Sequence, residues 1–552
     1  MATHHLEVER KYELADPQAD IAPIDWNVLE NFEVSESITE HLEATYFDTQ
    51  DADLGRNMVA LRRRLGGYDQ GWHIKFDDRA GARHEIGFSL LADHQRMPAA
   101  VNKFVRAVTL GDDLYETVSL ATERERTVLV DAEGTKVAEI CKDKVRALDF
   151  STDIERSWTE WEVELLDSGL VSPADIFTAC EVIFTNLGIT LSKSTAKIAR
   201  ALGKDECFEA RRQGLEGCAS TKNTTASSAA KKKSKKKTSR PKSSQKFLRQ
   251  ILHSLTSDLM IWEMKLRSDA PDAVHGMRKS ARQVEAILRY AVLPYISDDT
   301  SCQKVQDDIR YLKHLMGGLA SARDIEILTT FMWSVDTRPG LISETARREL
   351  DEYLSSDSEV ASKALIRVLD SPEYLQLRKD LVYLMNNLKA LVQLPEDSDE
   401  YTRKVAQHLR KALRAYVGKE YRHIWKPSVD EVVSAEQSDT LLFKIRRAGQ
   451  GAKYCLDAFE SAGMPLNTSE QKLWRMCDGF YDSLSILSDE KVIATWLEVA
   501  LRRATRRQND RLAIGYLLGG CDARIVQLRA KELSRIPELM LELKKLKFKK
   551  KS

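Results

Sequence analysis

Two periodicities of apolar and polar residues divide the chain. Over the first two hundred residues, apolar and charged positions alternate in short runs, as in His5–Tyr12. Successive side chains of a strand point to opposite faces, so a period of two predicts strands with one charged face. From about residue 247, apolar residues recur every three or four positions, as in Phe247–Leu255, and this spacing predicts helices. The pattern predicts an α+β multidomain chain with a strand-rich first part and an all-α second part.

The first strand-like run carries the most informative charges. Glu7, Glu9 and Lys11 are two apart and would point to one side of a strand. The side chains expected on a buried outer face are Leu6, Val8 and Tyr12. Two adjacent carboxylates can hold a divalent cation, and a nearby ammonium can meet an anion bound to that cation. The alternative is an edge strand whose charged face is simply solvated.

The same alternation recurs in later strand-like runs, some carrying bases in pairs and others acids. The alternating residues are Arg62 and Arg64, Lys75, Arg83 and Glu85, Arg124 and Arg126, and Glu160, Glu162 and Glu164. Burying so many unpaired ions would cost several kcal/mol each, so they must face water or a ligand. A closed antiparallel barrel with a charged, hydrated interior satisfies this requirement.

In their order along the chain, these motifs resemble the CYTH domain of the triphosphate tunnel metalloenzyme superfamily. The matching residues are Glu7-x-Glu9-x-Lys11, Tyr46-Phe47-Asp48-Thr49, Arg62/Arg64, Lys75, Glu85, Arg124/Arg126, Asp143, Glu162/Glu164 and Ser192-Lys193. The resemblance covers residues 1–205 and implies a closed antiparallel β-barrel tunnel of about eight strands. It also implies that the tunnel binds a linear triphosphate, with Mg²⁺ or Mn²⁺ as cofactor.

The resemblance further implies a role for each charged residue. The phosphates would be held by Lys11, Arg62, Arg64, Lys75, Arg124, Arg126 and Lys193. The metal would be held by Glu7, Glu9, Glu162 and Glu164. Glu7, Glu9 and Lys11 form the predicted catalytic set, in which a carboxylate orients the attacking water. Glu85 and Asp143 resemble second-tier ligands or orienting groups, and their alternative is a plain salt bridge to a neighbouring arginine.

Length and composition set broad limits. The 552 residues allow two to four domains, and 43% hydrophobic residues support sizeable cores. No run of about eighteen apolar residues occurs, so we expect no transmembrane helix and no membrane partner. The N-terminus lacks a basic region followed by an apolar stretch, which argues against a signal peptide. Eight cysteines without CxxC spacing argue against a zinc site and favour reduced thiols, so we expect a cytoplasmic protein.

The basic residues are unevenly placed, although the 84 basic and 84 acidic residues balance. Residues 220–246 contain lysine runs among serine, threonine and alanine, with no acid. Such a stretch buries no apolar surface and repels itself, which predicts a disordered linker. The predicted division is a CYTH domain (1–205), a linker (206–245), a helical domain (246–540) and a basic tail (541–552). The two basic segments either aid solubility or capture a polyanion.

One predicted helix, within Val274–Tyr290, carries a cationic stripe. At 100° per residue, its histidine and three arginines fall within a sector of about 60° on one face. These residues are His275, Arg278, Arg282 and Arg289. A cationic stripe beside a histidine suits an extended anion. The alternative is an ordinary solvated helix face, with His275 as a capping or core residue.

This helix resembles the first repeat of the CHAD domain, and Ala322-Arg323-Asp324 resembles the segment that follows it in that family. The resemblance implies two pseudo-symmetric helical bundles with a basic groove that binds inorganic polyphosphate. The remaining residues assigned to this groove are Arg410, Arg414, Arg446 and Lys453.

The second repeat departs from the family pattern. It would begin near Leu442, where Phe443 stands in the place of the family's histidine. Gly449 and Gly451 weaken the expected helix by roughly 1 kcal/mol each relative to alanine. The role of the second repeat in binding polyphosphate is therefore an open question.

Together these features favour a metal-dependent inorganic triphosphatase that converts tripolyphosphate to phosphate and pyrophosphate, with a helical domain that binds inorganic polyphosphate. The alternatives are an adenylate cyclase, a nucleoside or thiamine triphosphatase, or a non-catalytic polyphosphate-binding protein. Nucleic acid is the weaker choice of partner, because no aromatic residues interleave with the lysines of the linker. Association with polyphosphate granules is a further expectation.

Overall fold

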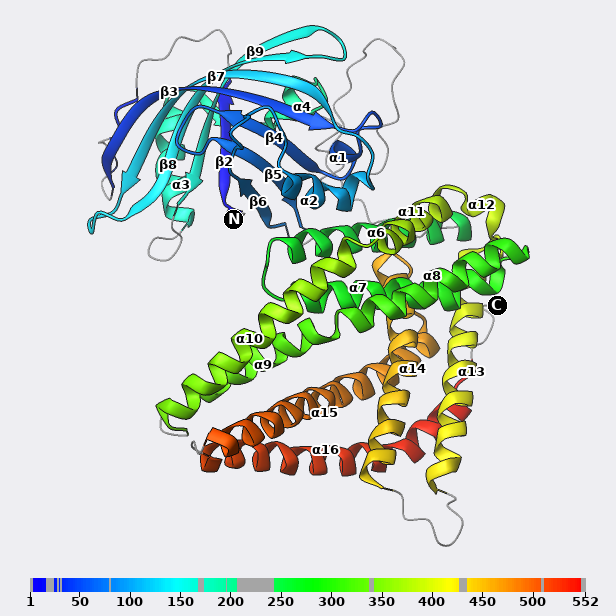
Figure 1. The fold of residues 1–552 in the computed structure, drawn as a ribbon. Helices are drawn as coiled ribbons and strands as arrows, with labels where there is room; N and C mark the ends of the chain where they lie inside the picture. The colour runs from blue at the N-terminus through cyan, green and yellow to red at the C-terminus, as the bar shows by residue number, and fades with distance from the viewer. Residues whose placement is uncertain are drawn as a thin grey trace. The chain divides into compact units, whose positions relative to one another are not determined.

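Two compact units make up the protein, residues 1–231 and residues 232–552. The computed structural model describes residues 3–15, 24–26, 29, 32–78, 81–166, 173–194, 196–205, 243–336, 342–425, 434–507 and 511–547. Most of the predicted linker, residues 206–242, lies outside the described residues. The first unit is the strand unit and the second is the helical unit (Figure 1).

One antiparallel sheet forms the strand unit. Its strands are β1 (Thr3–Glu7), β2 (Glu9–Leu14), β3 (Glu33–Asp48), β4 (Val59–Leu65), β5 (Gly71–Asp77), β6 (Arg83–Phe88), β7 (Tyr115–Val130), β8 (Lys136–Asp149), β9 (Ile154–Leu165) and β10 (Ile189–Leu191). They are hydrogen-bonded in the order β1-β6-β5-β4-β3-β7-β8-β9-β2-β10, and the long strands curve strongly (Figure 1). In the described part of the chain, the sheet thus has ten strands and an open order. The predicted closed barrel of about eight strands is wrong.

The order stays open because the N-terminal strand is interrupted. β1 pairs with β6 and β2 pairs with β9, and only Val8 separates β1 from β2 along the chain. No N-terminal strand is therefore paired along its whole length on both sides. The charged residues of β1 and β2 still face the same pocket, because one intervening residue leaves the alternation unchanged.

The outer face of the N-terminal strands differs from the expectation. Tyr12 is buried beneath α3 (Pro173–Asn186), with its ring 4.7 Å from that of Phe184. Leu6 and Val8, by contrast, are 61% and 42% exposed. The prediction of a buried outer face is therefore correct for Tyr12 and wrong for Leu6 and Val8. Alternation decides which way a side chain points, whereas a covering helix decides whether it is buried.

A short helix lies inside the curved sheet. α4 (Lys197–Ala201) packs Ile198 and Ala201 into an apolar cluster with inward-facing residues of β3, β7 and β8. Lys197, at the first position of α4, lines the pocket instead. The interior of the sheet therefore has an apolar layer beside a charged one. Among the described residues of the unit, the other helices are α1 (Asp53–Arg56) and α2 (Ala99–Thr109).

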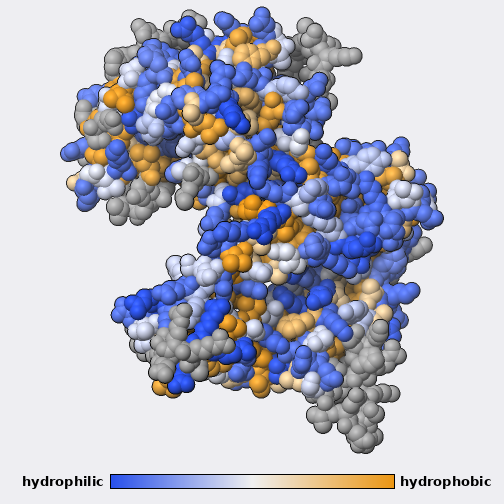
Figure 2. Space-filling view, in the orientation of Figure 1, coloured by the Kyte–Doolittle hydropathy of each residue, from blue (hydrophilic) through white to orange (hydrophobic). Residues whose placement is uncertain are grey.

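The helical unit has one extensive apolar core. Its helices are α6 (Ser244–Arg267), α7 (Ala273–Ile287), η2 (Leu288–Val292), η3 (Leu293–Tyr295), α8 (Asp299–Gly318), α9 (Ala320–Asp336), α10 (Glu344–Leu369), α11 (Pro372–Asn386), α12 (Leu388–Leu391), α13 (Ser398–Trp425), α14 (Ala435–Ser461), α15 (Thr468–Arg507) and α16 (Arg511–Lys545). Residues 541–545, predicted as part of a basic tail, instead continue α16. On the face shown, hydrophobic residues form small patches within a mostly hydrophilic surface (Figure 2). Among the described helices, none is both long and apolar enough to cross a membrane.

The two glycines that weaken α14 have different surroundings. α7 lies along α14 in the core, and a Cβ atom at Gly451 would come within 2.9 Å of the ring of Tyr290, a residue of η2. At Gly449 the nearest atoms, those of Cys477, would be 3.9 Å away, which is ordinary contact. Gly451 therefore allows a close approach between helices, whereas Gly449 has no such steric reason.

Candidate functional site

The concave side of the sheet holds a pocket of about 530 Å³. The predicted residues that line it are Glu7, Glu9, Lys11, Arg62, Arg64, Lys75, Glu85, Arg124, Glu162 and Glu164. Arg83, Glu139 and Lys197 line it as well. Of the remaining predicted residues, Arg126, Asp143 and Lys193 are outside the described lining.

Strand register places the acids in rows across the sheet. Glu9 of β2 lies opposite Glu164 of β9, and Glu164 lies opposite Glu139 of β8. In the next inward-facing row, Lys11 lies opposite Glu162 and forms an ion pair with it. Directly opposed like charges in neighbouring strands repel one another. The first row therefore favours a cation, and the second already contains one.

Glu7 and Glu164 both line the pocket, but cations lie much closer to Glu7 than to Glu164, and their pKa values differ accordingly. Lys75 Nζ lies 2.7 Å from one carboxylate oxygen of Glu7, and Arg83 Nε lies 3.0 Å from the other. Burial alone would raise the pKa of Glu7, but these two cations outweigh it and lower the pKa to about 2. Burial raises the pKa of Glu164 to about 7, because Lys75 only partly offsets it and the carboxylates of Glu7 and Glu9 add to it.

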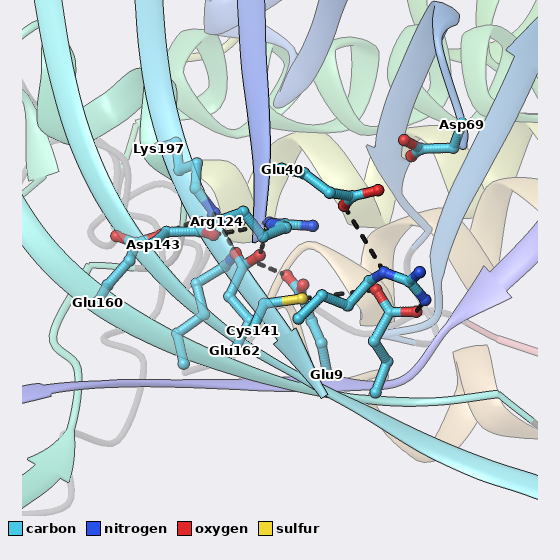
Figure 3. A network of polar contacts seen from close by, with 12 residues as sticks. Glu9, Glu40, Asp69, Arg124, Cys141, Asp143, Glu160, Glu162 and Lys197 are labelled. Atoms are coloured by element: carbon cyan, nitrogen blue, oxygen red, sulfur yellow. Dashed lines mark hydrogen bonds and ion pairs between the residues drawn. The ribbon is translucent and has the colours of Figure 1, made fainter. Parts of the chain in front are cut away.

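Lys197 lies among three carboxylates (Figure 3). Its Nζ is 3.0 Å from Asp143, 2.8 Å from Glu160 and 2.5 Å from Glu162. Arg124 donates two hydrogen bonds of 2.7 Å to Asp143 and one of 2.9 Å to Glu162. The three carboxylates each offer an oxygen within 4.8 Å of the others, close enough to share a metal ion. In this structure Lys197, Arg124 and Lys11 together balance their charge.

The arginines of β4 carry unsatisfied donors. Nε of Arg62 and Nε of Arg64 are buried, and neither has a hydrogen-bond partner among the described residues. Arg64 forms an ion pair with Asp69. Burial, together with repulsion from Arg62 and Arg124, lowers the pKa of Arg64 to about 9. Buried guanidinium groups that repel one another favour the binding of an anion.

Glu85 and Arg126 contact pocket residues in other ways. The Glu85 carboxylate lies 3.3 Å from Lys75 Nζ, 3.5 Å from Arg62 and 2.9 Å from Nδ1 of His73. This arrangement suits the orienting role or the salt bridge that the sequence left as alternatives for Glu85. Arg126 lies over the ring of Tyr68 at 4.8 Å and 3.5 Å from Glu139.

In the helical unit, cations from three helices come together. Burial, and then the like charges of Arg282, Arg323 and Arg446, lower the pKa of Arg278 on α7 to about 10. Burial and the charge of Arg323, on α9, also lower the pKa of His275. Nε of Arg446, on α14, is buried and has no hydrogen-bond partner among the described residues. We call these five residues the cation cluster.

The other residues predicted for the groove have different neighbours. Arg289 falls in the π-helical turn η2 and pairs with Glu285 at 2.7 Å. Lys453 pairs with Asp478 of α15. On α13, Arg410 donates to a backbone carbonyl, that of Leu546, and Arg414 is exposed. Lys453 also lies 5.7 Å from the ring of Tyr481, which Arg446 of the cluster contacts at 5.5 Å. Among the described contacts, none joins Arg289, Arg410 or Arg414 to the cation cluster.

Comparison with known families assigns both units. Residues 5–201 match the CYTH domain, and residues 250–498 match the CHAD domain. The chain joins a CYTH domain to a CHAD domain. Two uncharacterized proteins of Mycobacterium tuberculosis, MT2285 of strain CDC 1551 / Oshkosh and Rv2226 of strain ATCC 25618 / H37Rv, are each 26% identical to it over 424 residues. The match covers 74% of this chain and 76% of each relative.

Solved structures are similar to parts of this CYTH–CHAD protein. The CHAD domain from the plant Ricinus communis is 18% identical with a TM-score of 0.39, covering 56% of this chain and 93% of that one. PptA from Streptomyces chartreusis is 17% identical with a TM-score of 0.37, covering 55% and 99%. The PH1819 protein from Pyrococcus horikoshii OT3 is 16% identical with a TM-score of 0.22, covering 36% and 99%.

Within the CYTH domain, the structure places Lys197, rather than Lys193, in the pocket. Lys193 is exposed, and its backbone N–H lies 3.4 Å from Glu13, whereas Lys197 is buried among three carboxylates. The two lysines are four residues apart, and the second one begins a helix, which is the signal that could have distinguished them. Arg83 and Glu160 belong to the sequence alternation, but the alternation alone gave them no role.

Proposed function

We propose that the CYTH domain is a metal-dependent triphosphatase that hydrolyses tripolyphosphate to phosphate and pyrophosphate. One observation carries the proposal: buried Nε donors of Arg62 and Arg64 have no acceptor among the described residues, at a pocket that also contains closely spaced carboxylates. Unsatisfied guanidinium donors favour an anion, and crowded carboxylates favour a cation. A linear triphosphate with its divalent metal supplies both.

The cations of the pocket would hold the phosphates, because phosphoryl transfer depends mainly on positioning and charge neutralisation. Arg62, Arg64 and Arg124 present planar donors to phosphate oxygens, and Lys11 and Lys75 present ammonium groups. A water oxygen attacks the terminal phosphorus. The bond from this phosphorus to the bridging oxygen breaks, and pyrophosphate leaves with that oxygen.

A carboxylate of the Glu7–Glu9 pair would orient the attacking water, the role that the CYTH resemblance gives these residues, and the proton of that water would pass to the bridging oxygen of the leaving pyrophosphate. Lys75 and Arg83 hold Glu7 in place at 2.7 and 3.0 Å. Glu9 lies 3.2 Å from Lys11, so a carboxylate and an ammonium meet at one end of the pocket. This pairing fixes the carboxylates before substrate arrives.

The carboxylates fit Mg²⁺ or Mn²⁺, because both ions prefer oxygen ligands. Glu7, Glu9 and Glu164 would form one ligand set, in which Glu164 lies opposite Glu9 and is repelled by the carboxylates of both Glu7 and Glu9. Glu162 belongs to the second group, with Asp143 and Glu160, which Lys197 balances. A divalent cation held by the first group would neutralise phosphate charge and polarise the attacking water.

The test is phosphate release from tripolyphosphate with Mg²⁺ or Mn²⁺. Wild type should hydrolyse tripolyphosphate faster than ATP, and Glu9→Ala should lose at least about a hundredfold in rate. Glu123→Gln, which alters an exposed residue paired with Lys144, is the matched control and should keep full rate.

Other outcomes would replace the proposal. Faster turnover of ATP or thiamine triphosphate would indicate a nucleoside or thiamine triphosphatase, and formation of cyclic AMP would indicate an adenylate cyclase. Binding of tripolyphosphate without turnover of any triphosphate would leave a non-catalytic polyphosphate-binding protein.

We further propose that the CHAD domain binds inorganic polyphosphate at the cation cluster. The buried, unpartnered Nε of Arg446 and the mutual repulsion of the arginines support this role, because a polyanion would relieve both. The associated location is the cytoplasm, at polyphosphate granules. A fluorescent fusion should then follow granules in the cell and become diffuse when Arg278 is replaced by alanine.

A further inference from the structure

The loop between β4 and β5 forms part of the pocket wall. Gly66 and Gly67 open the loop with φ of +82° and +74°, in the left-handed region that favours glycine. A Cβ atom at Gly66 would lie 2.3 Å from the backbone oxygen of His41, so this position requires glycine. The next two residues, Tyr68 and Asp69, line the pocket. Two glycines therefore turn the chain so that a phenol and a carboxylate meet the charged interior.

Tyr68 contacts residues of the distant strands β7 and β8, whereas Asp69 contacts residues of the flanking strands β4 and β5. The Tyr68 hydroxyl donates to Glu139 at 3.2 Å, and the Arg126 guanidinium lies 4.8 Å from its ring. The Asp69 carboxylate pairs with Arg64, and its backbone oxygen accepts a hydrogen bond of 2.9 Å from Nε2 of His73. In Figure 3, Asp69 stands apart from the group around Lys197. The loop thus contacts pocket residues that are separate from the group around Lys197.

We propose that Asp69 is an internal counter-ion that occupies Arg64 in the unliganded protein and must leave when a triphosphate binds. The inference rests on the proposed function, because Arg64 is one of the arginines assigned to phosphate. Carboxylate and phosphate oxygens accept from the same guanidinium donors, so both cannot use the same N–H groups at once. The glycine pair provides the backbone freedom for the loop to withdraw.

Exposure and charge favour the replacement of Asp69 by a triphosphate at Arg64. The Asp69 side chain is 32% exposed, so it returns to water without crossing the core, whereas the Arg64 side chain is 6% exposed and stays. Asp69 brings one negative charge to one arginine. A triphosphate brings several charges that act on Arg62, Arg64 and Arg124 together, because these three guanidinium groups already lie close enough to repel.

The test is the affinity of Asp69→Asn for tripolyphosphate, measured by titration calorimetry without divalent metal at fixed salt. Asparagine keeps the size of the side chain but removes the charge that competes for Arg64. A loop that is closed about 80–90% of the time weakens the apparent affinity by the fraction that is open. We therefore expect a dissociation constant about five- to tenfold lower than that of wild type. Glu123→Gln should bind like wild type.

A second readout does not depend on affinity. Hydrogen exchange at the amides of residues 66–70 should speed up in wild type when tripolyphosphate is added. In Asp69→Asn, exchange at these amides should be fast already without ligand. Tyr68→Phe keeps the ring and loses the hydrogen bond to Glu139. Without ligand, its exchange rate at these amides should lie between the rates of wild type and Asp69→Asn.

The outcomes separate this inference from the proposed function. If wild type binds tripolyphosphate and Asp69→Asn binds equally or more weakly, or its loop exchanges no faster, Asp69 is not a competitor and the inference is wrong. If neither protein binds tripolyphosphate, the proposed function itself fails, and the inference fails with it.

Discussion

The strand unit and the helical unit each hold a buried acid, Glu7 and Asp308, and the pKa values of these two acids shift in opposite directions. In the strand unit, Lys75 and Arg83 balance Glu7 and lower its pKa to about 2, despite burial. In the helical unit, burial raises the pKa of Asp308 to about 7, because Asp380 adds to the effect and Lys304 does not compensate for it. A pocket for a metal and a phosphate needs both signs at close range. A site for one long anion needs an excess of cations, and in the cation cluster Arg282, Arg323 and Arg446 repel Arg278, an effect that Asp324 only partly offsets.

The largest effect should come from removing the cation that balances three buried carboxylates. Lys197→Ala leaves Asp143, Glu160 and Glu162 without that charge, and breaking a buried pair of this kind costs about 3–5 kcal/mol. We expect this loss in chemical denaturation, together with a loss of tripolyphosphate hydrolysis. Lys193→Ala, four residues away and exposed, is the control and should change neither. Equal losses in both variants would contradict the placement of Lys197.

A smaller effect should follow from opening the cation cluster. Arg278→Ala should weaken polyphosphate binding about tenfold, or about 1.4 kcal/mol, without destabilising the CHAD domain, because it also relieves repulsion from Arg282. Arg410→Ala should leave the affinity within about twofold, because this residue has no described contact with the cluster. Filter binding of radiolabelled polyphosphate at fixed salt measures both. Similar losses would mean that the groove extends along α13, as the sequence predicted.

Replacing the buried acid Asp308 of the helical unit should stabilise the protein, and the gain should depend on pH. The folded protein keeps Asp308 protonated up to about pH 7, whereas the unfolded chain ionises it near its ordinary value of 3.8. Wild type therefore loses stability as the pH rises from about 4 to 7. Asp308→Asn avoids this loss, so its melting temperature should exceed that of wild type by several degrees at pH 8 and by little at pH 4. A gain that is equal at both pH values, in scanning calorimetry, would refute the raised pKa.

The smallest effects concern the two glycines of α14. Gly449→Ala should stabilise the CHAD domain by about 0.5–1 kcal/mol, because alanine favours the helix and its Cβ atom has room. Gly451→Ala should give no such gain, because its Cβ atom would meet the ring of Tyr290 at 2.9 Å. Denaturant titration of both variants measures these changes in the free energy of unfolding. A gain at Gly449 alone would show that packing against Tyr290, rather than helix propensity, decides the effect at Gly451.

Sequence alternation predicted the strand residues of the pocket well. Glu7, Glu9 and Lys11 share one parity, and strands keep that parity over their whole length, so these residues line the pocket together. Lys197 was missed because it follows the last long strand, at the start of a helix, where strand parity no longer applies. Arg289 was grouped with the stripe by a rotation of 100° per residue. α7 ends at Ile287, and the π-helical turn that follows does not keep this rotation.

The sequence by itself determined the two kinds of unit and which side chains point together, because both follow from the local period of the chain. Tertiary structure decided how those charges are shared. Glu7 meets Lys75 across 68 residues, and Glu162 meets Lys11 across 151. Such pairs depend on strand register, and a one-residue shift in register would turn every side chain to the other face. The open order of the sheet has the same origin, since only pairing in space shows that β1 and β2 bind different strands.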